Sequence, residues 1–234
     1  MDKNSTMIIL GTAHLGTTPG KCSPDGRLRE AVWSRETCRE LNDIFHSYGY
    51  KSEIDYEPLN PSDIMKGATA KQQQQHELSA RVNFVNSLCK KHGAKNCIYI
   101  SIHVDAAGAD SKWHTAGGFT VWTSVGQTKS DILAECIYDR ALANMTEYSR
   151  IMANGKKMGC YDSKQRPFRM DTTDGDKDKE ASFYVLNNTA CPAILVECMF
   201  QDNKCDVEYL LSDIGRQSIV RTILEGAIKY IQEH

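Results

Sequence analysis

The stretch Cys97-Ile98-Tyr99-Ile100-Ser101-Ile102-His103 decides the predicted fold of this chain. It is a nearly continuous apolar run of strand length, and strands of this composition are typically buried on both faces of a parallel sheet. Parallel strands are joined by crossover connections, which are usually helices. The run therefore predicts an α/β fold in which the polar His103 ends a central strand.

The rest of the chain repeats this alternation of strands and helices. Further strands are predicted at 7–13, 50–56, 117–122, 182–186 and 193–196, and helical periodicity is found at 28–48, 77–92, 130–145 and 214–231. A length of 234 residues suits one well-buried core. We therefore expect a single α/β domain over residues 1–234, with a central, mostly parallel twisted sheet of about six strands flanked by helices on both faces.

Three segments are predicted to be loops. Residues 16–26 are rich in glycine, proline and serine, and residues 58–75 are polar. The most irregular segment is 148–181, whose polar run at 171–180 predicts a mobile loop within the domain. This run lacks the glycine position and the final glutamate of an EF-hand, so calcium binding is not expected from it.

Charge and hydropathy exclude several classes of protein. The chain has 28 basic and 30 acidic residues, a net charge of -2, and no basic stripe that would indicate nucleic-acid binding. No apolar run approaches the roughly 18 residues of a transmembrane helix. The polar start Met1–Thr6 is followed by a short apolar run and is not a signal peptide, which leaves the export route open.

The nine cysteines are odd in number and scattered, so they do not indicate the disulfide framework of a small secreted domain. Synthesis in a reducing compartment is the favoured interpretation. Cys89, His92 and Cys97 lie close in sequence but lack a second ligand pair at zinc-finger spacing. A structural zinc site is therefore not expected there.

Four polar residues occupy positions where α/β folds place their ligand sites. His14, His103 and Glu197 each follow or end a predicted strand, and ligands bind beyond the carboxyl ends of such strands. Glu30 lies near the start of the first long helix. Two imidazoles and a carboxylate suit zinc and leave a position open for water or substrate, as in catalytic zinc sites. One histidine at a strand end is more often an ordinary hydrogen-bonded residue, so the prediction depends on the coincidence, and His114 is a weaker candidate.

The contexts of these residues resemble the zinc-dependent N-acetylmuramoyl-L-alanine amidases of the Amidase_3 family almost from end to end. The similar motifs are Gly11-Thr12-Ala13-His14-Leu15-Gly16 with Pro19-Gly20, Gly26-Arg27-Leu28-Arg29-Glu30, Arg81-Val82-Asn83-Phe84-Val85-Asn86, Ser101-Ile102-His103-Val104-Asp105-Ala106, Phe183-Tyr184-Val185-Leu186 and Pro192-Ala193-Ile194-Leu195-Val196-Glu197 with Asn203 beyond. The chain departs from the family where Ala13 and Leu15 replace glycines, where Asp105 replaces the more usual asparagine, and in Cys198-Met199-Phe200.

The resemblance implies a hydrolase that cuts the amide bond between N-acetylmuramic acid and the L-alanine of the stem peptide. His14, Glu30 and His103 would hold Zn²⁺, and Glu197 would act as the general base that activates water. Peptidoglycan or a muramyl peptide would be the substrate. The site of action would be the bacterial cell wall or periplasm, reached as a phage-type lysin or after removal of a leader.

Regulation and substrate binding are also suggested by the segment 148–181. Some family members carry an inhibitory helix at this place until a partner displaces it, which implies a possible activator protein. The segment supplies candidate groups for binding the carboxylates of the stem peptide, namely Lys156, Lys157, Lys164, Arg166 and Arg169. Two alternatives remain open: a zinc peptidase that acts within the stem peptide, and a noncatalytic peptidoglycan-binding module.

Overall fold

The computed structural model describes residues 1–16, 18, 20–55 and 67–234. Its strands are β1 (Met7–Thr12), β2 (Lys51–Ile54), β3 (Cys97–Asp105), β4 (Thr120–Thr123), β5 (Lys179–Glu180) and β6 (Ala193–Phe200). Its helices are α1 (Glu30–Ser47), α3 (Ala70–His92), α4 (Lys129–Asn144), α5 (Thr146–Lys157), α6 (Tyr184–Asn188), α7 (Lys204–Leu211) and α8 (Asp213–Glu233), with a short 3-10 helix at Ala94–Asn96.

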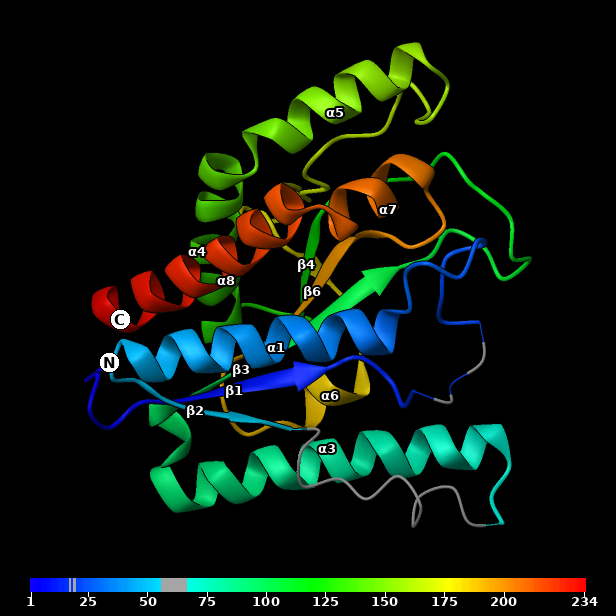
Figure 1. Cartoon of the computed structure of the whole chain (residues 1–234). Coiled ribbons are helices and arrows are strands. Elements are labelled where there is room, and N and C mark those ends of the chain that lie inside the picture. The colour runs from blue at the N-terminus through cyan, green and yellow to red at the C-terminus, as the bar shows by residue number, and fades with distance from the viewer. Residues whose placement is uncertain (17, 19, 56–66) are drawn as a thin grey trace.

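The strands form one sheet in the order β2-β1-β3-β6-β4-β5. Strand β1 pairs in parallel with β2 and β3, β3 pairs in parallel with β6, and the β6–β4 pair is antiparallel. Helices cover both faces, with α3 and α6 on one side and α1, α4 and α8 on the other (Figure 1). The predicted single α/β domain with a six-stranded, mostly parallel sheet is confirmed.

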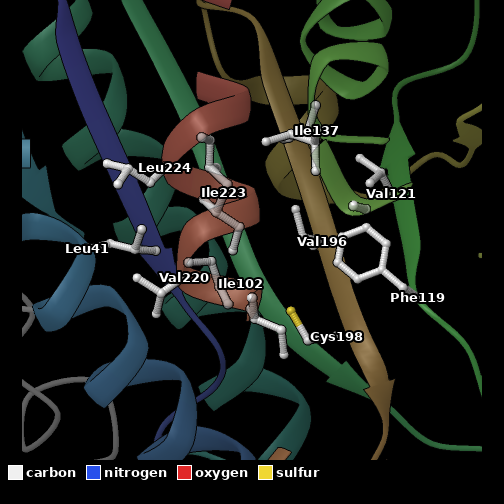
Figure 2. Close-up of a cluster of buried hydrophobic side chains, with 14 of the residues drawn as sticks. Leu41, Ile102, Phe119, Val121, Ile137, Val196, Cys198, Val220, Ile223 and Leu224 are labelled. Atoms are coloured by element: carbon white, nitrogen blue, oxygen red, sulfur yellow. The ribbon is translucent and has the colours of Figure 1, made fainter. Parts of the chain in front are cut away.

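Side chains of the central strand alternate between two cores, as the period of two in a strand requires. Ile98, Ile100 and Ile102 enter the larger core, whereas Cys97 and Tyr99 enter the smaller core next to α3. Figure 2 shows part of the larger core, where residues of β3, β4 and β6 pack with residues of α1, α4 and α8. The central strands are therefore buried on both faces.

Toward the carboxyl ends of the strands, the face that carries the smaller core changes from apolar to polar. On this face of β3, Tyr99 is followed by Ser101, His103 and Asp105, which are every second residue of the strand. On the same face of β6, Leu195 is followed by Glu197. His103 and Glu197 are direct partners in the parallel register of β3 and β6. Polar side chains thus replace apolar ones at the carboxyl ends of the central strands.

The predicted strand at 182–186 is wrong, because Tyr184–Asn188 forms helix α6 and the neighbouring strand β5 is confined to Lys179–Glu180. Val185 and Leu186 are buried in the smaller core. A short apolar run fits either a strand or a buried helical turn, so its periodicity alone could not decide between them. The segment 148–181 is also more regular than predicted, since it includes most of α5 and all of β5.

Helix α3 begins seven residues before the predicted start at 77, and its first turn explains the difference. The Thr69 side chain accepts a hydrogen bond from the backbone N–H of Gln72, whose side chain caps the N–H of Thr69 in return. This capping box stabilises a polar first turn that has no apolar signal. Residues 56–66, which include the first half of the predicted loop at 58–75 and the end of the predicted strand at 50–56, lie outside the described residues.

A disulfide joins Cys160, which follows α5, to Cys205 in the first turn of α7. No sequence pattern indicated that these two cysteines, which are 45 residues apart, would pair. The remaining seven cysteines are free thiols, and all of them belong to the described residues. The two ends of the chain also meet, because the amino group of Met1 donates to the carbonyl of Ile231 at 2.6 Å. Within the described ranges, no helix has the length and apolarity needed to cross a bilayer.

A buried ion network fixes the end of β1 to α3. The carboxylate of Asp55 accepts hydrogen bonds from the guanidinium of Arg81 at 2.7 Å, the backbone N–H of Thr12 at 2.9 Å and the hydroxyl of Tyr99 at 2.8 Å. Arg81 also pairs with Glu77 at 2.9 Å. Asp55 is fully buried and Arg81 nearly so. Such a network orders its surroundings because each charged group is saturated with partners.

Replacing Asp55 with alanine should destabilise the fold by about 3–5 kcal/mol, because it leaves the Arg81 charge buried with too few partners. Guanidinium-induced unfolding measures this loss. The control is Glu53→Ala, which removes an exposed carboxylate from neighbouring β2 and should leave the midpoint nearly unchanged. Equal midpoints for the two variants would contradict the role given to the network.

Candidate metal centre and active site

His14 follows β1 in a backbone conformation that a non-glycine residue seldom adopts. Its φ is +45°, in the left-handed region. The carbonyl of His14 accepts hydrogen bonds from the guanidinium groups of Arg35 at 2.5 Å and Arg81 at 3.3 Å. The preceding N–H, that of Ala13, donates to the Ser34 hydroxyl at 2.8 Å. Helices α1 and α3 thus hold the turn in place although Ala13 and Leu15 stand where the family has glycines.

Glu30 is the first residue of α1 and lies between the two histidines. A turn in the preceding loop brings it there, since its N–H donates to the carbonyl of Lys21 at 3.0 Å. Its Oε1 lies 3.1 Å from Nδ1 of His103, and its Oε2 lies 3.5 Å from Nε2 of His14. The N–H of Val104 donates to Oε1 at 3.2 Å. Glu30 is only 1 % exposed, so both carboxylate oxygens are fixed inside the fold.

The three side chains fit a bound metal ion. One donor atom from each of His14, Glu30 and His103 lies within 4.8 Å of the other two. Oε2 of Glu30 is buried and has no hydrogen-bond donor, which a cation would compensate. Nε2 of His103 lies 3.1 Å from the Ser101 hydroxyl, so Nδ1 is left to face Glu30. Two imidazole nitrogens and a carboxylate are a donor set that zinc prefers over magnesium.

Burial and neighbouring charges put His14 and Glu30 in the protonation states that a metal would require. Burial lowers the pKa of His14 to about 3, although the charge of Glu30 acts in the opposite direction. Burial on its own would raise the pKa of Glu30, but the hydrogen bond and charge of His103, followed by His14 and Lys21, lower it below its usual value. At neutral pH His14 is therefore a neutral imidazole and Glu30 an anion.

Glu197 lies next to this group on β6, beside His103 in the sheet. Its Oε2 is buried and has no hydrogen-bond donor. Burial raises the pKa of Glu197 well above its usual value, and the negative charges of Asp105 and Glu30 raise it further. The strand bulges just beyond it, where Met199 has a φ of +63° and the pairing between β3 and β6 shifts. A carboxyl with these properties is suited to general acid–base chemistry.

Arg169 is the one of the five predicted basic residues that the structure connects to this edge of the sheet. It forms an ion pair with Asp105 at 3.2 Å, and its guanidinium lies over the ring of Phe200, 4.8 Å from the centroid. Lys156 and Lys157 end α5. The hydrogen bonds of Arg166 go to the carbonyls of Lys164 and Gln165.

His114, the weaker candidate, lies in the loop after β3 and is not part of the group of three. Its Nε2 pairs with Asp110 at 2.8 Å, and its backbone joins Asp202 and Asn203 beyond β6. Asn203 caps α7. These contacts give His114 a role in connecting the loops that follow two strands.

Sequence reasoning did not identify Lys21, Ser34 and Arg35 as parts of the site. Lys21 lies 3.9 Å from Oε2 of Glu30. The Ser34 hydroxyl donates to the carbonyl of Ile102 at 2.6 Å and thereby links α1 to β3. Ser34 follows Glu30 by four residues, which is one turn along the same helix face, and this spacing was the only available signal.

A cleft of about 390 Å³ lies beside Lys21, between the loops that follow β1, β3 and β6. Ala106 and Gln201 are among its lining residues. The cleft lies beyond the carboxyl ends of the strands, where open α/β sheets bind their ligands, but His14, Glu30, His103 and Glu197 are not among its lining residues.

The fold and the arrangement of the site define an α/β protein with a candidate metal centre at the carboxyl ends of its parallel strands. Residues 8–229 match the Amidase_3 family, described as N-acetylmuramoyl-L-alanine amidase, and the chain belongs to this family. No individually curated protein matches the sequence.

Several solved structures have the same fold at low sequence identity. The CwlD amidase from Clostridioides difficile, solved in complex with the GerS lipoprotein, has a TM-score of 0.70 at 19 % identity, with 98 % of this chain and 100 % of that chain covered. The amidase AmiC2 of Nostoc punctiforme has a TM-score of 0.63 at 19 % identity over 97 % and 98 % of the two chains. Ami1 from Mycobacterium smegmatis has a TM-score of 0.64 at 17 % identity, and both chains are covered completely.

Replacing Ser101 with alanine should weaken zinc binding about 10- to 100-fold, because the hydroxyl orients the His103 ring. Competition with a chromogenic chelator measures the affinity. The same replacement at exposed Ser87 on α3 is the control and should bind zinc like the parent chain. Unchanged affinity in Ser101→Ala would show that the hydroxyl does not position the ligand.

Proposed function

We propose that this chain hydrolyses the amide bond between N-acetylmuramic acid and the L-alanine of the peptidoglycan stem peptide, with zinc as its cofactor. His14, Glu30 and His103 are assigned as the metal ligands and Glu197 as the general base. The observation that carries the proposal is the convergence of three donor groups within 4.8 Å at the edge where Glu197 also emerges. Membership in the amidase family supports the choice of bond.

When bound, zinc would polarise the carbonyl of the scissile amide and lower the pKa of a coordinated water to about 7. The residues of the chain supply the remaining functions. Glu30 and the Ser101 hydroxyl fix the directions of the two imidazoles. Arg35 and Arg81 hold the backbone of His14. The ligands are thus positioned before substrate arrives, which removes reorganisation from the reaction.

Glu197 would accept a proton from the attacking water and then deliver it to the departing nitrogen of L-alanine. The second transfer is required because an amine anion is too basic to leave unaided. Its pKa is raised toward neutral pH relative to that of an ordinary glutamate, which suits both proton transfers. The base must be ionised, so activity is expected to fall as the pH drops below the pKa of Glu197.

Arg169 is the proposed contact for a carboxylate of the stem peptide. Phe200 and Asp105 hold its guanidinium at the edge of the sheet. The guanidinium has five N–H donors, so the ion pair with Asp105 leaves others that can bind a second carboxylate. The bacterial cell wall is the corresponding site of action.

Control by a partner or by residues 148–181 stays a prediction. The solved complex of CwlD with the GerS lipoprotein makes a partner protein a reasonable part of the proposal. Tyr148 and Met152 of α5 are buried in the larger core. Deleting the whole segment would therefore disturb the fold, and point substitutions at Arg169 are the better way to examine its influence.

Incubating the zinc-loaded chain with a defined muramyl peptide should release a peptide whose L-alanine has a free amino end. Mass spectrometry of the products, with a zinc-free sample as control, identifies the bond. Cleavage between amino acids would assign a peptidase instead. Binding to peptidoglycan without any cleavage would assign a noncatalytic binding module.

Replacing Glu197 with glutamine should reduce kcat by about 10²- to 10⁴-fold, because the general base is lost. Zinc content, measured by atomic emission, should remain that of the parent chain, since Glu197 is not assigned as a ligand. The control is Glu147→Gln, which alters a glutamate at the exposed start of α5. Loss of zinc together with activity would mean that Glu197 is a metal ligand.

A further inference from the structure

A second group of metal-ligating side chains lies where the end of α8 packs against α4. It consists of Cys136 on α4 with Glu233 and His234 at the end of α8. One donor atom from each of the three lies within 4.8 Å of the other two. Among the described residues, this group and the candidate metal centre are the two sets of side chains with that geometry. The fold therefore permits a metal ion at a place that the proposed amidase chemistry does not use.

The three side chains have no other polar partner that would explain why they lie together. Cys136 is 3 % exposed and a free thiol, and its sulfur forms no hydrogen bond within the described part of the chain. Over the same residues the carboxylate of Glu233 forms no ion pair or hydrogen bond. The imidazole of His234 packs on the ring of Tyr230, with 5.6 Å between the centroids. The sulfur, oxygen and nitrogen donors are thus free to bind a metal ion.

The end of α8 carries negative charge that no basic side chain of its last turn balances. This turn contains Glu233 and no basic residue, although the carbonyls at the C-terminus of a helix favour a nearby cation. Lys229, one turn earlier, contacts Asp139 on α4 at 2.5 Å. A metal ion between α8 and α4 would supply the missing positive charge.

Packing fixes the backbone on both sides of the group. Tyr230 and Ile231 of α8 are buried in the larger core. The N–H of His234 donates to the carbonyl of Tyr230 at 3.1 Å, so the helical turn continues to His234. A Cβ atom on Gly226 would lie 3.1 Å from the carbonyl oxygen of Cys136, which shows how closely α4 and α8 approach each other. The ligands therefore come from two helices whose relative position is already set.

We propose that Cys136, Glu233 and His234 bind a zinc ion that joins the end of α8 to α4. Thiolate sulfur and imidazole nitrogen select zinc over magnesium and calcium, which prefer oxygen donors. Zinc bonds of about 2.0–2.3 Å place tetrahedral ligands roughly 3.5 Å apart, so rotation of the exposed side chains of Glu233 and His234 completes the site. Water takes the fourth position, and the thiol releases its proton to solvent on binding.

The proposed ion is remote from the candidate metal centre and has a structural role. The carbonyl of Ile231, in the last turns of α8, accepts the hydrogen bond from the amino group of Met1. Figure 1 shows both chain ends at the start of β1, whereas the candidate metal centre follows the end of β1. The zinc ion would therefore stabilise the last helix on the core without contacting substrate.

Cobalt spectroscopy distinguishes this site from the candidate metal centre. Co²⁺ can replace zinc in both, but only a bound thiolate gives an intense near-ultraviolet charge-transfer band, and His14, Glu30 and His103 include no sulfur donor. The parent chain and His14→Ala should both show the band. Cys136→Ser should lose it, whereas Cys22→Ser, which changes another free thiol, should retain it.

Zinc content provides a second measurement that requires no buried substitution. His234→Ala removes an exposed ligand and should leave about one zinc ion per chain fewer than the parent binds, as measured by atomic emission. His76→Ala, the same change at an exposed histidine of α3, should bind as much zinc as the parent.

Absence of the cobalt band from both the parent chain and His14→Ala would overturn the proposal. A band that persists in Cys136→Ser, or equal zinc contents in His234→Ala and His76→Ala, would also overturn it. The band requires no substrate and no residue of the proposed amidase site. Failure of this proposal and failure of the proposed function are therefore distinguishable.

Discussion

In-register parallel pairing of β1, β3 and β6 places the ends of three strands at one level. Thr12 pairs with Ile102, and the next residue of β3, His103, pairs with Glu197. A shift of one residue in this register would turn His103 or Glu197 toward the opposite face of the sheet. The apolar residues on both faces prevent such a shift, because each slip would expose one core and bury polar groups in the other. The packing of the sheet thus determines how His103 and Glu197 are placed relative to each other.

The local sequence pattern was sufficient to predict most strands of the sheet, but not the structure of the segment that contains β5 and α6. The run at 97–103 is long and apolar enough to specify a buried central strand, and β3 was found there. The predicted strand at 182–186 is too short for its period to be read, and Tyr184–Asn188 forms the helix α6 instead. Contacts between segments far apart in the sequence could not be predicted from the local pattern. The Cys160–Cys205 disulfide and the Asp55–Arg81 ion pair both depend on the packing of separate elements.

The sequence predicted which three side chains meet at the candidate site, but not the groups that hold them in place. His14, Glu30 and His103 were identified from residue type and position, and the structure brings them together. The groups that hold them were missed, because Arg35 acts on the backbone of His14 and not on its ring. Hydrogen bonds from two arginines stabilise the left-handed conformation of His14. Ala13 and Leu15 do not have a positive φ, so neither position requires the conformational freedom of glycine.

The contact between Met1 and the last turns of α8 has a topological consequence. Both termini lie at the end of the sheet opposite the carboxyl ends of the parallel strands, as Figure 1 shows for β1 and the chain ends. A short linker could join them without crossing the face on which substrate would bind. The chain is therefore a good candidate for circular permutation, and a fusion partner attached at either terminus would emerge from the same side and leave the candidate site accessible.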